Sequence, residues 1–387
     1  MARPALPARP PRPPLPGWLP RLGGRLLPAL CAAAGVLLPL QAGAGPAVPA
    51  EVPGEGAVGQ GAASAWAWLD RMVRAARRLH YEGTFVYQRG ESLVSMRLVH
   101  VGPPQGERER LVALNGERRE VLRTEEGVVC LTPGRRLVKE GPASALGPLP
   151  GLGSAAQELA GHYRIEPRGG GRVAGREAQV LWVSPRDRYR YGYRLWLDRA
   201  SGLLLRSQLV GDDGRVLEQV LFTSLELRPE PTAAMLAAVE AGSGGWEAAA
   251  EERVRTRRLD EGEPWPLEPL GLSWAALRPP PGFRVARRYL HRLEGGEGKG
   301  MLPGMLQVVL SDGLASVSVF VEPLREGEPA FHGEAAWGAV HAFGAVVDGH
   351  QLSVVGEVPA ETVRLVGRSL LEGGGPRGSA EIDEEGR

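Results

Sequence analysis

The sequence predicts an α+β protein in which a large antiparallel sheet, covered by helices, is followed by a smaller second unit. Apolar residues recur at three- and four-residue steps over 62–79, which predicts an amphipathic helix. Short apolar runs then alternate with glycine-, asparagine- and aspartate-containing turns up to residue 227, which is typical of antiparallel strands. A proline- and glycine-rich stretch at 229–270 separates these strands from a second set at 271–371. A sheet that carries apolar residues on both faces must be covered on one side and curl or close on the other.

The N-terminal 44 residues have the composition of a cleavable secretory signal. Five arginines and no acidic residue precede an apolar stretch at 26–40, and the small-residue site Ala42-Gly43-Ala44 follows it. A permanent membrane anchor is the alternative, but a spanning helix needs about 20 apolar residues and this stretch is shorter. We therefore expect residues 1–44 to be a signal peptide, 45–61 a flexible leader, and the mature protein to be exported.

The first predicted domain covers 62–228. After the helix at 62–79, strands are expected at 81–87, 94–98, 110–114, 120–123, 128–131 and 137–139, with a weaker helix near 154–159. Three further strands, at 189–197, 203–210 and 215–227, are joined by glycine- and aspartate-containing turns and form a meander. The two helices are the available covers for this sheet.

The second predicted domain covers 271–371 and follows the linker at 229–270. Its strands are expected at 283–290, 307–310, 315–321, 338–347 and 352–355, and its helix at 359–371, with a proline at an early helical position. The tail at 372–387 is rich in glycine and glutamate, and we expect it to be disordered.

Composition and motifs argue against several classes of function. The 46 basic and 45 acidic residues give a net charge of +1, which excludes a generally basic nucleic-acid binder. The zinc-site, nucleophile-elbow and phosphate-loop motifs are absent from the sequence, so we expect no catalytic set, no metal and no cofactor. Without the signal peptide the chain keeps only Cys130, which lies in an apolar run and is expected to be a buried structural thiol.

Two groups of residues are candidate binding sites. In one, arginines alternate with tyrosines, so that Arg186, Arg188, Arg190 and Arg194 would share one face of a strand and form a surface for an anionic partner, such as lipid phosphate or an acidic peptide. The alternative is a solvated basic face on an ordinary strand. In the other, apolar residues of the sheet would line a ligand cavity, namely Phe85, Tyr87, Tyr191, Tyr193, Leu195 and Phe222. The alternative for each of these is ordinary core packing.

Several separated blocks of the sequence resemble the MucB/RseB family. They lie at 68–72 (Trp-Leu-Asp-Arg-Met), 81–87 (Tyr-Glu-Gly-Thr-Phe-Val-Tyr), 115–121, 187–198, 311–323 and 354–359. The resemblance spans roughly 62–371, across both predicted domains and in order. It implies an N-terminal domain like that of lipoprotein carriers, an open, curved antiparallel sheet (a half-barrel) with covering helices, followed by a smaller C-terminal α/β domain.

The resemblance also implies a non-enzymatic periplasmic regulator of the envelope-stress sigma factor. Such a protein would bind the periplasmic part of a membrane-anchored anti-sigma factor, shield it from proteolysis, and release it on lipid-type envelope signals, with a lipid or lipopolysaccharide as ligand. The C-terminal domain and the linker side of the large domain are the expected footprint. A periplasmic lipid or lipoprotein carrier without a regulatory partner is the alternative, and an envelope hydrolase a weaker one. The sequence leaves the oligomeric state open, a homo-oligomer included.

Overall fold

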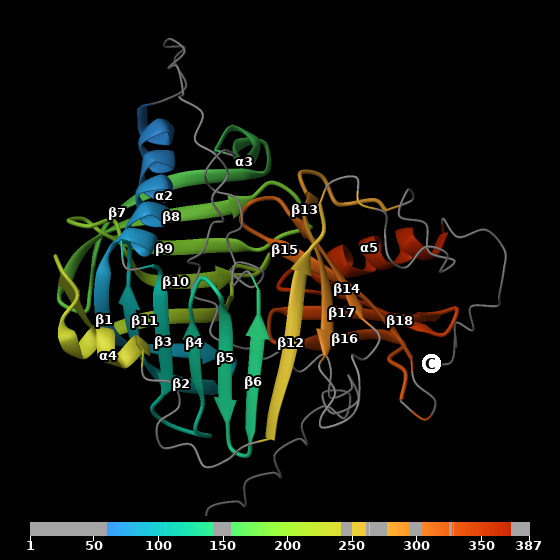
Figure 1. Cartoon of the computed structure of the whole chain (residues 1–387). Coiled ribbons are helices and arrows are strands. Elements are labelled where there is room, and N and C mark those ends of the chain that lie inside the picture. Colours follow the sequence, from blue (N-terminus) through green and yellow to red (C-terminus); the bar gives the residue numbers. More distant parts are fainter. Residues whose placement is uncertain are drawn as a thin grey trace, which may run out of the picture.

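A computed structural model describes residues 60–104, 106–141, 156–240, 250–260, 263, 277–293, 304–324, 327 and 329–372 (Figure 1). The expected signal peptide, the leader up to residue 59 and the tail beyond residue 372 lie outside these residues. Within the described part, no helix is both long and apolar enough to cross a membrane.

The first eleven strands form an open, strongly curved antiparallel sheet. They are β1 (His80–Arg89), β2 (Ser92–Val101), β3 (Arg108–Ala113), β4 (Glu120–Arg123), β5 (Gly127–Thr132), β6 (Arg135–Glu140), β7 (Tyr163–Val173), β8 (Arg176–Pro185), β9 (Gly192–Asp198), β10 (Leu204–Val210) and β11 (Val216–Arg228). Their pairings run in the order β7-β8-β9-β10-β11-β1-β2-β3-β4-β5-β6. In Figure 1, β8–β10 run nearly across the direction of β3–β6, which shows how far the sheet curves.

The remaining strands continue the same sheet. They are β12 (Ala250–Arg258), β13 (Arg284–Leu293), β14 (Met305–Ser311), β15 (Ser316–Pro323), β16 (Gly333–Trp337), β17 (Val340–Val347) and β18 (His350–Gly356). From β6 the pairings continue as β12-β13-β14-β15-β18-β17-β16, and β6–β12 is the one parallel pair among them. The predicted fold class, α+β with an unclosed, curved antiparallel sheet and few helices, is confirmed.

Helix α2 (Gln60–Arg78) covers the inner face of the first eleven strands. Its residues Leu69 and Met72 pack with Leu181 and Leu195 of β8 and β9. Its last turns, through Ala75 and Ala76, join a second cluster that contains Phe85, Phe222 and Cys130. The side chain of Cys130 is buried in this cluster, as the sequence leads one to expect.

Three shorter helices complete the described part of the fold. Helix α3 (Ala156–His162) lies beside β7, and α4 (Ala233–Glu240) packs Met235 and Val239 against Val99 and Val101. Because Val99 and Val101 alternate with Leu98, which belongs to the α2 side, α4 covers the opposite face of the sheet. Helix α5 (Ala360–Glu372) packs on β17 and β18 and completes the core of the C-terminal part.

The range expected to be a linker contains regular structure. Helix α4 and strand β12 both fall within 229–270, and β12 is hydrogen-bonded to β6 on one side and β13 on the other. The many charged side chains of β12 hide the strand pattern in the sequence. In the structure they form ion pairs with β6: Glu252 with Arg135 at 2.7 Å and Arg253 with Glu140 at 3.0 Å. The two parts of the molecule are therefore joined through a shared strand as well as through side-chain contacts. The β7–β8 hairpin and β16 were likewise not predicted from the sequence.

Candidate functional site

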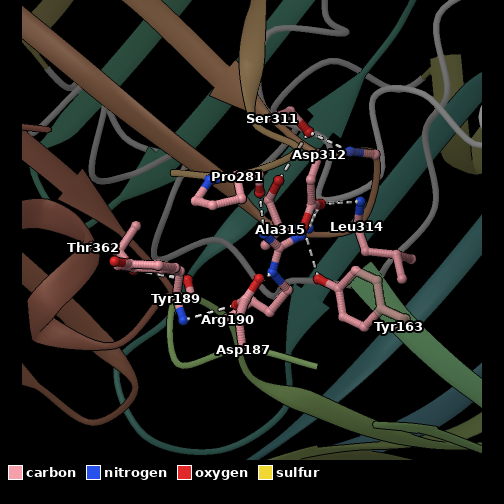
Figure 2. Close-up of polar contacts among 11 residues, drawn as sticks. Tyr163, Asp187, Tyr189, Arg190, Pro281, Ser311, Asp312, Leu314, Ala315 and Thr362 are labelled. Atoms are coloured by element: carbon pink, nitrogen blue, oxygen red, sulfur yellow. Dashed lines mark hydrogen bonds and ion pairs between the residues drawn. The ribbon is translucent and has the colours of Figure 1, made fainter. Parts of the chain in front are cut away.

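The junction between the N-terminal sheet and the C-terminal part contains a buried ion pair. Arg190, from the loop before β9, pairs with Asp312, from the turn after β14, and neither side chain is exposed to solvent. The guanidinium also donates to Asp187 at 3.0 Å and to the carbonyl oxygen of Pro281, while the hydroxyl of Tyr163 donates to Asp312 at 2.9 Å (Figure 2). One arginine thus ties together β7, the loop before β9 and two segments of the C-terminal part.

Both ends of this ion pair are held by local turns. The carboxylate of Asp187 accepts the backbone N–H of Tyr189 at 3.0 Å, which bends the chain ahead of β9 and turns Arg190 inward. On the other side, Asp312 accepts the N–H groups of Leu314 and Ala315 at 2.8 and 2.7 Å. The aspartate is therefore positioned by its own turn as well as by Arg190.

Burial and charge act in opposite directions on this pair. Burial raises the pKa of Asp312, whereas Arg190 and the turn N–H groups act to lower it. The ring centroids of Tyr163 and Phe283 lie 5.3 and 5.0 Å from the guanidinium carbon of Arg190, so the cation is also held between two aromatic rings. Burial, and then the charge of Asp312, raise the pKa of Tyr163, so this hydroxyl remains a hydrogen-bond donor.

The edge of the same contact combines a buried hydrogen bond with an exposed ion pair. Thr362, in the first turn of α5, donates its hydroxyl to the carbonyl oxygen of Tyr189 at 2.7 Å. Beside it, Arg188 and Glu361 form an ion pair at 2.8 Å, with 71% and 37% of their side chains exposed. These two groups are accessible to a partner that lies across the junction.

A second contact lies between the β1 and β11 strands and the β16–β17 hairpin. Arg89 and Glu218 form a buried ion pair at 2.7 Å, and the Tyr87 hydroxyl donates to the same carboxylate. The guanidinium carbon of Arg89 lies 4.2 Å from the ring centroid of Trp337. Gly338 follows with a φ of +61°, and a Cβ there would lie 2.8 Å from Cδ of Arg89, so only glycine fits this turn.

Two carboxyl groups face each other at this second contact. Burial, and then the negative charge of Glu218, raise the pKa of Glu357 well above its ordinary value, while Arg89 acts to lower it. One arginine balances one carboxylate, so the second carboxyl is most stable in its neutral form. The junction is thus held by charges whose balance depends on protonation.

The four arginines predicted to share one strand face are separated in the structure. Residues 186–190 form bends, and β9 begins only at Gly192, so the prediction of a strand from residue 189 is wrong at its start. Arg190 is buried in the junction and Arg188 lies at its rim, while Arg186 donates to the carbonyl oxygen of Ala160 at 3.2 Å. Only Arg194 lies on a strand. The prediction from the alternation of arginine and tyrosine is wrong because Asp187 bends the chain before β9.

The six residues predicted to line a cavity are divided among three adjoining clusters, with Tyr87 also packed against the cluster of Phe85 and Phe222, and Tyr193 also against that of Tyr191. Phe85 and Phe222 are buried together, with ring centroids 5.7 Å apart. Leu195 lies beneath α2, with Tyr193 packed beside it. The other two belong to the second junction contact: Tyr87 through Glu218, and Tyr191 through Ala339. A cavity lined by these residues remains a prediction.

Sequence reasoning missed Asp312, Glu218 and Glu357 as junction residues. The only local signal was the Ser-Asp-Gly turn at 311–313, which marks a turn and gives no sign of a distant partner. Chemically, the junction groups pair with and neutralise one another. This arrangement is suited to holding two parts of a protein together and to responding when a partner or a proton changes that balance.

Comparisons with known proteins cover both parts of the chain. The model of the MucB/RseB N-terminal domain matches residues 64–240, and that of the MucB/RseB C-terminal domain matches residues 269–371. The sigma factor AlgU regulatory protein MucB of Pseudomonas aeruginosa is 34% identical over 321 residues, which are 80% of this chain and 91% of that protein. The sigma-E factor regulatory protein RseB of Escherichia coli K12 is 25% identical over 317 residues, 79% of this chain and 90% of that protein.

Solved structures give the same result. The crystal structure of MucB in complex with MucA(peri) is similar with a TM-score of 0.53 and 31% identity, covering 78% of this chain and 96% of that one. A crystal structure of MucB is similar with a TM-score of 0.54 and 30% identity, covering 79% and 97%. The relatives are thus matched over nearly their whole length.

Proposed function

Because the chain belongs to the MucB/RseB family, we propose that it is a non-enzymatic periplasmic regulator that binds the periplasmic part of a membrane-anchored anti-sigma factor. By covering this partner it would shield it from proteolysis and so restrain the envelope-stress sigma factor. Residues 1–44 would be removed on export. The domains would be the sheet domain at 62–228 and the C-terminal domain at 271–371.

The strongest support is the similarity to MucB crystallised with MucA(peri), which extends over 96% of that MucB chain. The junction adds a physical reason. A polypeptide that lies across both parts can bind one arrangement of them more tightly than another, and only such a difference lets binding and release be regulated. We place the footprint on the C-terminal part and the adjoining side of the large sheet, where Arg188 and Glu361 are accessible.

Release by a lipid-type ligand would act through the same junction. Tyr87 and Tyr191, two of the predicted cavity residues, contact the groups of the second junction contact. A ligand that displaced these side chains would disturb Glu218 and Ala339 and so change the fit between the two parts. The coupling is reciprocal: the ligand would lower the affinity for the partner, and the partner would lower the affinity for the ligand by the same factor.

The test uses the purified mature protein, residues 45–387, and the periplasmic domain of the anti-sigma factor from the same bacterium. We expect a complex by calorimetry, and slower cleavage of the anti-sigma domain by the protease that starts its degradation when the protein is present. Equal cleavage rates with and without the protein, or no complex, would refute the proposal.

A matched pair of variants locates the footprint. Arg188→Gln removes an exposed charge at the rim of the junction, and Arg118→Gln removes an exposed charge on the β3–β4 turn. We expect the first to weaken the complex several-fold and the second to leave it unchanged. If neither matters, the footprint lies away from this rim, whereas lipid transfer between membranes without anti-sigma binding would favour the alternative function, a carrier.

A further inference from the structure

Strands β8, β9 and β10 carry arginine and tryptophan side chains on the face opposite to α2. Leu195 and Leu197 of β9 are buried on the α2 side, so Arg194 and Trp196, which alternate with them, lie on the other face. Trp182 of β8 is paired with Arg194, and Arg206 of β10 is paired with Trp196. We call Trp182, Arg194, Trp196 and Arg206 the Arg–Trp face.

On this face the guanidinium groups cover the indole rings. The guanidinium carbons of Arg168 and Arg194 lie 4.8 and 4.9 Å from the ring of Trp182, and that of Arg206 lies 4.4 Å from the ring of Trp196. A Cβ on Gly171 of β7 would lie 2.9 Å from Cδ1 of Trp196, so glycine lets this ring lie close against β7. A guanidinium stacked in this way keeps its N–H edge free for a planar oxyanion.

Arg194 and Arg206 have no carboxylate partner within the described part of the chain. Arg206 donates to the side-chain oxygen of Gln219 at 3.1 Å, and Arg194 donates to the carbonyl oxygen of Gly214 at 3.5 Å. Burial, and then the positive charge of Arg194, lower the pKa of Arg206, which is the sign of two cations held close together. An anion placed between or beside them would relieve this repulsion.

The spacing of the two arginines fits an extended chain. Arg194 is paired with Gln208, so Arg206 is its diagonal neighbour on the next strand, at about 7–8 Å. In an extended segment, side chains two residues apart lie on one face at about 6.6 Å. Two carboxylates at positions i and i+2 of such a segment therefore match the two guanidinium groups.

The same geometry argues against other occupants. Bases and sugar rings bind tryptophan by stacking, and here guanidinium groups already lie over both indole rings. Insertion into a lipid surface needs uncovered apolar groups, but the guanidinium groups of Arg168 and Arg194 lie over the ring of Trp182, and Trp196 lies against β7. The groups that remain available are the guanidinium N–H donors.

We propose that the Arg–Trp face binds an extended acidic segment of a partner polypeptide, with carboxylates two residues apart, one at Arg194 and the other at Arg206. This site lies on a different surface from the junction and does not depend on the proposed function. Of the four arginines in the predicted anionic-partner face, Arg194 alone belongs to the Arg–Trp face.

The test measures binding of fluorescent peptides to the full mature chain by anisotropy. The probe is a twelve-residue peptide of alternating glutamate and threonine, with glutamine replacing glutamate in the control peptide. We expect the glutamate peptide alone to bind, with an affinity that falls as salt is raised. Loss of both arginines in Arg194→Gln/Arg206→Gln should weaken binding about tenfold or more, since each stacked guanidinium makes a charge-assisted contact.

Two further variants make the result specific. Arg118→Gln/Arg292→Gln removes the same charge from exposed positions elsewhere and should change the affinity less than about twofold. Arg194→Lys/Arg206→Lys keeps the positive charge but lacks the planar guanidinium groups that stack on the indole rings. This variant should bind the peptide more weakly than the native protein. Equal affinities of the Arg194/Arg206 glutamine variant and its charge control, or binding to phosphatidylglycerol vesicles but not to the peptide, would overturn the proposal. Thermal unfolding checks that each variant is folded.

Discussion

Arg190 and Asp312 lie 122 residues apart in the chain and form an ion pair in which neither side chain is exposed. Each is the buried counter-charge of the other, and each is held by a turn of its own. The contact between the two parts of the protein therefore depends on two charges that must be buried together.

Removal of either charge is expected to destabilise the protein strongly. Asp312→Asn keeps an oxygen for the turn N–H groups but removes the fully buried counter-charge of the guanidinium, which then pairs with the partly exposed Asp187 alone, at an expected cost of about 3–5 kcal/mol in the free energy of unfolding. Urea unfolding of this variant, of Arg190→Met and of the double variant measures the cost and the coupling. The exposed pair Arg228–Glu226 is the control, where Arg228→Met should cost about 1 kcal/mol or less. Similar costs at the two pairs would contradict this account.

Stability should also depend on the protonation of Glu357. Because burial and Glu218 raise the pKa of this carboxyl in the folded protein, the folded state binds a proton that the unfolded state has already released above its ordinary pKa of 4.5. The free energy of unfolding should therefore decrease as the pH rises above about 4.5. Glu357→Gln mimics the neutral form and should remove this decrease, as seen by urea unfolding from pH 4.5 to 8. Glu117→Gln, at an exposed position, serves as the control and should leave the pH dependence unchanged.

A second pH dependence is expected from His291, with the opposite sign. Burial, and then the charge of Lys139, lower the pKa of this imidazole from 6.5 to about 3, and the neutral ring bonds to Thr256 and Gln307 at 2.9 and 2.8 Å. Between these two pKa values the imidazole is protonated in the unfolded state and neutral in the folded state. The free energy of unfolding should fall with decreasing pH, by up to about 1.4 kcal/mol per pH unit.

Comparison with His291→Gln isolates this contribution. The variant lacks the titrating ring, so its stability should fall less steeply than that of the native protein between pH 6.5 and 4. NMR titration of the imidazole gives an independent measure. An imidazole that titrates near 6.5 in the folded protein would show that the ring is accessible and that the expected slope is absent.

Much of the fold was predictable because strand and turn signals are local. The strand expected at 120–123 coincides with β4, and the helix expected at 359–371 differs from α5 by one residue at each end. Strand β12 was missed because it is rich in charged side chains, several of which pair with β6, more than a hundred residues earlier in the chain. The β7–β8 hairpin was missed because three consecutive glycines at 169–171 suggest a loop, whereas they accommodate a bulge and the ring of Trp196.

The candidate site was less predictable, for a related reason. The alternation of arginine and tyrosine at 186–194 suggested one strand with one basic face, but the carboxylate of Asp187 bends the chain and directs Arg190 into the interior. A period-two pattern carries no information about a partner such as Asp312, which the fold brings in from another part of the molecule.

Strand β12 limits how the two parts can move. It is hydrogen-bonded to β6 along one edge and to β13 along the other, so a free rotation would break one of these two ladders. A motion that keeps both ladders intact is a hinge motion with its axis along β12. Contacts between the two parts that lie close to β12 would then persist, while those farthest from it would separate first. A partner would therefore gain access between the N-terminal sheet and the C-terminal part from the side away from β12.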